Sequence, residues 1–206
     1  MENIALNTDQ LDVLREIGTV GSGSAATALS QLLSKRVSIT VPKVSLVAGD
    51  KISPAALSMN DEDIGLAVDL KILGALRGGM LVLYSQKSAL MMIDILMKRP
   101  AGSTQLLNLL EASALSESSH ILAGAYLNAV AQMLDLHNLM LSIPQTIVDR
   151  MDRLNILLGR RLSDGGVNYL LPIENKMVIE DTEVDLFVIF LLEVDSVTKM
   201  LKIVGL

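Results

Sequence analysis

The chain of 206 residues contains no cysteine, no tryptophan and only three tyrosines and two phenylalanines. Without cysteine, disulfide bonds, thiolate metal sites and thiol catalysis are excluded. The absence of cysteine is compatible with the cytosol, although it does not prove that location. Half of the residues are apolar but few are aromatic, so the core must consist of Leu, Ile, Val, Met and Ala, with Met filling irregular gaps.

Basic residues are fewer than acidic ones: the chain has 17 Lys and Arg and 23 Asp and Glu, which gives a net charge of −6. This charge disfavours a nucleic-acid backbone or an anionic lipid surface as partner, since both attract basic proteins. The longest apolar run, Leu186–Leu192, is far shorter than the roughly 18 residues of a membrane span. Residues 1–10 contain neither the basic region nor the apolar core of a signal peptide. We therefore expect a soluble cytoplasmic protein with no nucleic-acid partner and no membrane insertion.

What the chain does contain is one stretch that occurs twice. Residues Leu11–Pro42 return in altered form as Ser113–Pro144. An internal repeat of this length indicates that one structural unit has been duplicated. The clearest correspondences are Leu14-Arg15-Glu16 with Leu115-Ser116-Glu117, and Gly23 with Gly124.

Each copy of this stretch begins the same succession of predicted elements: a helix, then strands, then a second helix. The clearest linker is Arg99–Ser103, so the repeats extend roughly over 9–100 and 106–206. We expect one α+β domain over 1–206, with pseudo-twofold symmetry and a largely antiparallel sheet flanked by helices.

The first half is predicted to hold a helix from Thr8 or Asp9 to Lys35-Arg36, strands Val37–Val41, Val44–Val47, Ile64–Leu70 and Leu76–Tyr84, a loop Gly49–Asp63, and a helix Ser85–Lys98. After Pro42, the segment Val44–Val47 is either a second strand or the same strand past a bulge. The second half is predicted to hold a helical lead-in Leu106–Glu111, a helix Ala112–Leu134, strands Leu139–Ile143, Thr146–Val148, Val167–Glu174 and Leu186–Leu192, a weaker segment Val178–Glu183, and a helix Asp195–Val204. Asp149–Arg161 fits a helix or a strand, and Gly165-Gly166 indicates a turn.

The first helix of each half has one apolar side and one polar side. Successive helical residues lie about 100° apart around the axis, so positions i, i+4, i+7 and i+11 share a face. We expect the two polar faces to be exposed on separate and similar surfaces. The face opposite the core carries Asp12, Glu16, Thr19 and Gly23 in the first copy and Ser113, Glu117, His120 and Gly124 in the second.

Three glycines lie inside the first of these helices, where each costs roughly 1 kcal/mol relative to alanine. Gly18 and Gly21 are on the apolar side, where they allow another backbone to pack closely. Gly23 is on the polar side, where it leaves room for a partner. The alternative is that the helix breaks near Gly21–Gly23.

No sequence motif for a metal, a nucleotide or a nucleophile stands out. The two histidines, His120 and His137, are far apart and lack a second ligand at metal-binding spacing. The segment Gly18–Gly23 reads GxxGxG, which is the wrong order for a dinucleotide fingerprint and does not follow a strand. For any single carboxylate of the polar faces, an ordinary solvated position is the better interpretation. The candidate site is instead the polar face that both copies repeat.

These repeated residues resemble the CheC-type phosphatases of chemotaxis, which have CheX and FliY as relatives. That family carries the motif Asp/Ser-x3-Glu-x2-Asn-x22-Pro, twice in CheC. Asp12, Glu16 and Pro42 keep the spacing in the first copy, and the surrounding residues are similar to the family's EIGNIGAGNAATA segment. Ser113 and Glu117 keep it in the second copy, where Pro144 falls one residue late.

The resemblance implies that the protein binds a CheY-type response regulator and hydrolyses its aspartyl phosphate. In the family, the glutamate is thought to grip a lysine of the regulator and the asparagine to orient the attacking water. Here Thr19 and His120 replace both asparagines, and either could still orient water through its polar atoms. The implied catalytic residues are therefore Glu16, Thr19, Glu117 and His120, and the implied contact residues are Asp12, Gly23, Ser113 and Gly124.

No cofactor of its own is implied for the protein, because the Mg²⁺ would belong to the regulator. The replaced asparagines leave an alternative open: an adaptor that binds CheY, or the receptor deamidase CheD, without efficient hydrolysis. A structural relative in the flagellar switch is the third interpretation.

Overall fold

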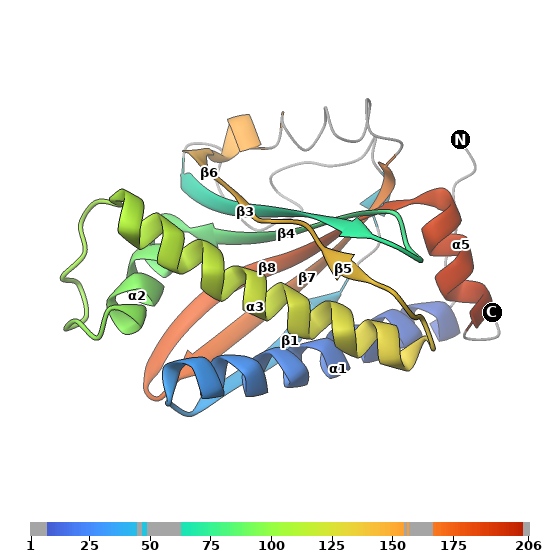
Figure 1. Cartoon of the computed structure of the whole chain (residues 1–206), viewed down its shortest axis with the longest axis horizontal. Coiled ribbons are helices and arrows are strands. Elements are labelled where there is room, and N and C mark those ends of the chain that lie inside the picture. The colour runs from blue at the N-terminus through green and yellow to red at the C-terminus, as the bar shows by residue number, and fades with distance from the viewer. Residues whose placement is uncertain (1–7, 45–46, 49–62, 155, 157–166, 204–206) are drawn as a thin grey trace.

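The computed structural model describes residues 8–44, 47–48, 63–154, 156 and 167–203 (Figure 1). The Gly49–Asp63 loop, except Asp63, and most of Asp149–Arg161 after Leu154 lie outside the described residues, as does the Gly165-Gly166 turn. The elements are α1 Thr8–Leu33, β1 Val37–Val44, β2 Val47–Ala48, β3 Ile64–Leu73, β4 Gly78–Ser85, α2 Gln86–Leu96, α3 Leu109–Met133, β5 Met140–Leu141, β6 Gln145–Arg150, β7 Val167–Ile179, β8 Thr182–Glu193 and α5 Val194–Ile203. The predicted succession of helix, strands and helix is present in both halves.

The strands described by the structure form one eight-stranded sheet in which the two halves interleave. The order is β1-β7-β8-β4-β3-β5, with β2 also pairing with β7 and β6 also pairing with β3. Every pairing is antiparallel, as predicted. The β8–β4 pair joins the halves at the centre, while β1 of the first half reaches the second half's β7, and β5 and β6 of the second half reach β3. This exchange of edge strands gives the sheet its pseudo-twofold arrangement.

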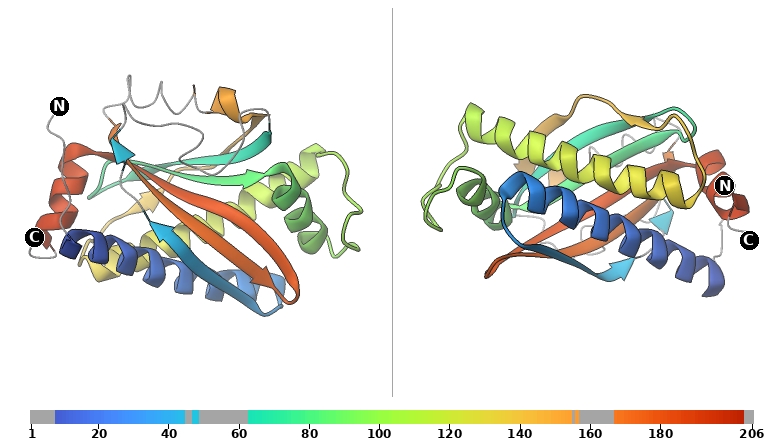
Figure 2. Two further views of the ribbon diagram at one scale, coloured as in Figure 1. Left: turned by 180° about the vertical axis from the view of Figure 1, so that it is seen from behind. Right: turned by 60° about the horizontal axis from the view of Figure 1, so that its bottom comes forward.

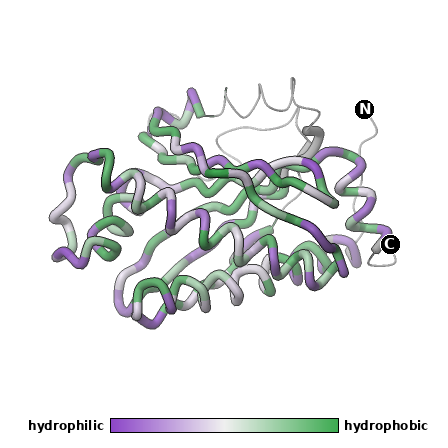
Figure 3. The backbone as a smooth tube through the Cα atoms, in the orientation of Figure 1, coloured by the Kyte–Doolittle hydropathy of each residue, from purple (hydrophilic) through white to green (hydrophobic). Residues whose placement is uncertain are grey.

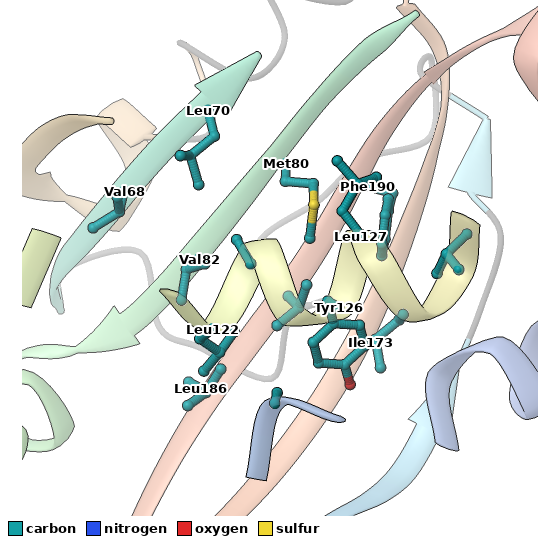
Figure 4. Close-up of a cluster of buried hydrophobic side chains, with 14 of the residues drawn as sticks. Val68, Leu70, Met80, Val82, Leu122, Tyr126, Leu127, Ile173, Leu186 and Phe190 are labelled. Atoms are coloured by element: carbon teal, nitrogen blue, oxygen red, sulfur yellow. The ribbon is translucent and has the colours of Figure 1, made fainter. Parts of the chain in front are cut away.

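Helices α1 and α3 lie side by side on one face of the sheet, while α2 and α5 lie at opposite ends (Figures 1 and 2). The larger hydrophobic cluster fills the space between this helical layer and the sheet. A smaller cluster on the other face of the sheet includes Met151 and Leu154 of the helical residues 151–154. Apolar residues run along the central strands (Figure 3), and α3 crosses them with Leu122 and Tyr126 turned toward the sheet (Figure 4).

The glycines of α1 serve side-chain packing and do not break the helix, which is continuous from Thr8 to Leu33. An added Cβ at Gly21 would lie 2.2 Å from the Tyr126 ring of α3, and one at Gly18 would lie 3.1 Å from the Val44 side chain of β1. The predicted close neighbours were backbones, so the prediction is corrected: an aromatic ring and a valine occupy the space. The alternative of a helix break at Gly21–Gly23 was wrong.

The predicted linker Arg99–Ser103 is clamped at both ends. The buried Asp94 carboxylate of α2 accepts hydrogen bonds from the backbone N–H groups of Gly102, Ser103 and Thr104, at 2.7 to 3.0 Å, and from the Thr104 hydroxyl at 2.6 Å. Burial raises the pKa of Asp94, but these four hydrogen bonds outweigh it and hold the pKa below its ordinary value. Arg99 pairs with the buried Glu111 of α3 at 2.5 Å.

Several predicted boundaries in the second half differ from the structure. The lead-in and helix predicted as two pieces are one helix, α3, that begins at Leu109. Asn108 caps it and forms a reciprocal capping box with Glu111, which fixes the start. The predicted strand Leu139–Ile143 shrinks to β5, and the weak segment Val178–Glu183 is the turn region of the long β7–β8 hairpin. In the first half, β1 continues past Pro42 with a register shift between Thr40 and Lys43, which confirms the bulge.

Candidate functional site

The first copy of the candidate site lies on the exposed side of α1. Asp12, Glu16, Thr19 and Gly23 are all exposed there, whereas Leu14 and Ile17 are buried beneath them. Asp12 is held by Arg15 in an ion pair of 2.8 Å, with both side chains more than half exposed. Such a pair contributes less than about 1 kcal/mol to stability, but it neutralises the charge at the start of the polar face.

The Thr19 side chain already forms a hydrogen bond within its own helix. Its hydroxyl donates a hydrogen bond to the Arg15 carbonyl oxygen at 2.9 Å. The hydroxyl has a single hydrogen, so this bond leaves only acceptor lone pairs for a visiting molecule. The side chain is also short and lies close to the helix surface. In this conformation Thr19 is a poor substitute for a carboxamide that both donates and accepts.

The second copy lies on α3, where Ser113 and Glu117 are exposed and His120 and Gly124 are half-buried. Glu117 makes no ion pair or hydrogen bond with another described residue, and neither does Glu16. Both carboxylates therefore face solvent rather than internal cations. The imidazole of His120 lies one helical turn from Glu117, on the same side of α3.

A polar contact with the sheet holds α3 at Ser119, the residue that precedes His120. The buried Ser119 hydroxyl lies 3.1 Å from the Tyr84 hydroxyl of β4 and 2.7 Å from the Leu115 carbonyl oxygen, to which it donates. Burial raises the pKa of Tyr84 to about 12, and the hydrogen bond with Ser119 opposes that rise. The phenol therefore stays neutral at physiological pH and acts as a fixed hydrogen-bonding support for this turn of α3.

The two copies share one helical layer but lie at opposite ends of it. Helices α1 and α3 run antiparallel and meet where Gly21 faces Tyr126 (Figure 2). Glu16 lies five residues from this point and Glu117 nine residues from it, in opposite directions, so they are about 20 Å apart along the helices at a rise of ~1.5 Å per residue. The two polar faces are therefore separate, as predicted. One side chain of a partner cannot contact both carboxylates.

Both polar faces contain a glycine that internal packing does not require. A Cβ added at Gly23 or at Gly124 would meet no described atom within 4 Å. Each glycine instead lowers the helix surface beside the polar line, where another molecule could approach closely.

The structure offers no competing metal centre among the described residues, which contain no group of three or more His, Asp or Glu placed to hold a metal. No helix among them is long and apolar enough to cross a membrane. A cleft of about 650 Å³ lies between the end of α1, the end of α2 and the β7–β8 turn. None of the predicted site residues lines this cleft, so it is separate from the candidate site.

Comparison with known proteins finds similarity to the same kind of protein. A model of the CheC-like family matches residues 10–46, which contain the first copy of the site. The CheY-P phosphatase CheC of Bacillus subtilis (strain 168) is 29% identical over 182 residues, covering 87% of this chain and 81% of that protein.

Among solved structures, FliY of Thermotoga maritima has a TM-score of 0.76 at 20% identity and covers 98% of both chains. A chain of the CheX–CheY–BeF3–Mg²⁺ complex from Borrelia burgdorferi has a TM-score of 0.52 at 14% identity, covering 85% of this chain and 96% of that one. The fold is therefore that of these chemotaxis proteins. The chain is therefore similar in sequence to CheC, and in fold to FliY and CheX.

Sequence reasoning missed one feature next to the second copy. Leu106, Leu109 and Leu110 are strongly exposed at the start of α3, where a helical lead-in was predicted without any statement of its exposure. Asn108 followed three residues later by Glu111 is a sequence signal for the start of the helix, but it does not indicate which leucines are exposed.

Proposed function

We propose that this protein binds a CheY-type response regulator through the polar faces of α1 and α3, and that the α3 face hydrolyses the regulator's aspartyl phosphate. The observation that carries this proposal is the exposed Glu117 with His120 one helical turn away. Similarity to the CheY-P phosphatase CheC, and a solved complex of CheX with CheY, support the choice of partner. CheX is similar to this chain in fold only.

The proposed chemistry divides between two side chains. Glu117 accepts hydrogen bonds from an ammonium of the regulator and so fixes its orientation. His120 accepts a hydrogen bond from a water molecule and holds it in line with the phosphorus. The water oxygen bonds to phosphorus, the bond from phosphorus to the aspartyl oxygen breaks, and the water proton leaves with the inorganic phosphate. The Mg²⁺ that balances the phosphoryl charge belongs to the regulator, so this chain supplies no cofactor.

We assign the weaker catalytic role to the α1 face. Thr19 has given its only donor hydrogen to the Arg15 carbonyl, and Arg15 neutralises Asp12. Glu16 can still dock a cation, so α1 is proposed as a binding surface with little hydrolytic activity. If His120 also proves inactive, neither face can orient water, and the second candidate function, an adaptor for CheY or CheD, is favoured.

A dephosphorylation assay separates the two functions. Phosphorylated CheY-type regulator is mixed with wild type, Glu117→Ala or His120→Ala, and the loss of phosphate is followed over time. Catalysis on α3 predicts that wild type accelerates the loss and that both variants reduce the acceleration at least tenfold. Tight binding by wild type without any acceleration would reject hydrolysis and leave the adaptor function.

A further inference from the structure

Three leucines at the start of α3 are among the most exposed apolar side chains of the described chain. Leu106 is 81% exposed, Leu109 is 89% exposed and Leu110 is 69% exposed. Leu107, between them in sequence, packs against the main core instead. We refer to Leu106, Leu109 and Leu110 as the leucine patch. Contiguous exposed apolar residues of this kind mark interaction sites on soluble proteins.

The leucine patch is held rigidly, which separates it from a frayed helix end. The Asn108 side chain accepts from the Glu111 backbone N–H at 3.0 Å, and Glu111 accepts from the Asn108 backbone N–H at 2.9 Å. Arg99 also pairs with Glu111, and Asp94 holds the preceding loop at Thr104. A surface fixed in this way loses little conformational entropy when it binds.

The leucine patch adjoins the polar face of the second site. At about 100° per residue around α3, measured from Leu109, Leu110 lies at about 100°, Glu117 at about 80° and His120 at about 20°. Glu117 and His120 therefore lie in the sector between the two leucines, about two and three turns further along the helix. A molecule that contacts Glu117 on this side of α3 extends over the leucine patch if it reaches two turns toward the N-terminus.

The first copy lacks this feature. The repeat aligns Glu16 with Glu117, an offset of 101 residues, which places Thr8 and Asp9 of α1 where α3 has Leu109 and Leu110. The start of the α1 face is polar and carries the Asp12–Arg15 ion pair. The two sites therefore differ in the kind of surface that they can bind.

We propose that the leucine patch is the apolar anchor by which the second site binds the receiver domain of a CheY-type regulator, and that the second site therefore binds it more tightly than the first. This inference rests on the proposed function. The surface presents one carboxylate near three exposed leucines, so the complementary surface of the partner should carry a cation near exposed apolar side chains. Apolar anchors at the centre of an interface provide most of its affinity.

Binding measurements on the full chain test the inference. Receiver domain held in its phosphorylated state by beryllofluoride and Mg²⁺ is titrated calorimetrically with wild type, Leu109→Gln, Leu109→Gln/Leu110→Gln and Glu117→Ala. The matched control is Leu73→Gln, because Leu73 is also an exposed leucine, at 46%. Its neighbour Ile72 belongs to the hydrophobic cluster beneath the helices, so Leu73 points to the opposite face of the sheet. Circular dichroism confirms that each variant is folded.

We expect Leu109→Gln to raise Kd about tenfold or more, since burying a leucine side chain is worth at least about one factor of ten in affinity. The double variant should raise it further, and Leu73→Gln should leave it unchanged. In 1 M NaCl, where the screening length is about 3 Å, the effect of Glu117→Ala should shrink while that of Leu109→Gln persists.

Each other outcome overturns the inference in a distinguishable way. If wild type binds and Glu117→Ala weakens binding but Leu109→Gln does not, the anchor is rejected and the proposed function stands. If wild type does not bind the receiver at all, both fail. The solution masses of wild type and Leu109→Gln are also compared by light scattering. If wild type is a dimer, Leu109→Gln is a monomer and Kd for the receiver is unchanged, the leucine patch joins two copies of this chain instead.

Discussion

Replacing Gly21 by alanine should destabilise the protein, although alanine is normally favoured in helices. The added Cβ would lie 2.2 and 2.3 Å from two carbons of the Tyr126 ring, whereas carbon atoms in contact lie about 3.5–4.0 Å apart. The ring, or α1 itself, must therefore move by more than about 1 Å. The perturbation acts at the point where α1 and α3 pack, so it tests how the two site-bearing helices are held together.

The Tyr126 ring has little freedom to retreat. It is fully buried and meets Phe190 edge-on at a centroid distance of 6.4 Å. Its hydroxyl donates to Asn175 Oδ1 at 2.6 Å, with a longer contact to the Gly18 carbonyl at 3.2 Å. Burial raises the pKa of Tyr126, so the hydroxyl remains a neutral donor. Moving the ring disrupts these hydrogen bonds.

The magnitude follows from three opposing effects. Overpacking costs about 1–3 kcal/mol, and a weakened buried hydrogen bond costs about 1–3 kcal/mol, while alanine in a helix regains about 1 kcal/mol over glycine. The net loss for Gly21→Ala should be about 1–5 kcal/mol in the free energy of unfolding. At Gly23, where an added Cβ meets nothing within 4 Å, only the helix gain remains. Gly23→Ala should therefore stabilise by about 0.5–1 kcal/mol.

Urea unfolding followed by circular dichroism measures both variants under the same conditions. The two substitutions are chemically identical and lie two residues apart in one helix, so their opposite signs isolate packing against α3. A Gly21→Ala variant as stable as wild type would refute the described packing of α1 on α3.

Three further predictions concern the clamp, the first site and the support beneath the second site. Asp94→Asn should lower the midpoint of thermal unfolding by roughly 5 °C at pH 7. Because the pKa of Asp94 is lowered in the folded state, its contribution to stability is present above the unfolded pKa near 4 and is lost as pH falls through the folded pKa. The stability of the variant should therefore vary less with pH in acid than that of wild type. An unchanged acid profile would contradict this role. Thr19→Asn should increase the rate of regulator dephosphorylation in a Glu117→Ala background, because a carboxamide restores both a donor and an acceptor on α1; no increase would mean that α1 does not present this position to the phosphate. Tyr84→Phe should reduce the rate of dephosphorylation a few-fold without changing Kd, because it removes the hydrogen bond that holds Ser119, the residue that precedes His120; a change in Kd alone would argue against a positioning role.

The helices that carry the site could be predicted from sequence because helical periodicity is a local property. Spacing at three and four residues separated Leu14 and Ile17 from Asp12 and Glu16, and the structure buries the first pair and exposes the second. The repeat then extended the same reasoning to α3. The similarity to CheC and the antiparallel α+β fold were also predicted correctly, on the strength of the repeated motif.

The arrangement of the strands could not be predicted in the same way. Alternating apolar residues identify a strand but not its neighbour, so the pairing of β1 with β7, across more than a hundred residues of sequence, left no local signal. The clamp at Asp94 was missed for a related reason. Asp94 lies between Ile93 and Ile95 in the sequence of α2. Only the loop that follows α2 brings the backbone N–H groups of Gly102 and Thr104 to its carboxylate.

The leucine patch was missed because hydropathy alone was applied to residues 106–111. Residues 106–111 were predicted as a helical lead-in with no statement of which leucines are exposed. Asn108 and Glu111 fix the start of the helix, but only the tertiary structure shows that Leu107 packs on the core and that Leu106, Leu109 and Leu110 do not.

The most direct test of hydrolysis at α3 compares matched double variants in a single-turnover assay of phosphorylated regulator. Glu16→Ala/Thr19→Ala removes the α1 site, and Glu117→Ala/His120→Ala removes the α3 site, with two substitutions at equivalent positions in each variant. We predict that the first variant keeps the wild-type rate within about threefold and that the second falls to the regulator's own rate of phosphate loss. A wild-type rate in the second variant, or its loss in the first alone, would contradict the assignment of catalysis to α3.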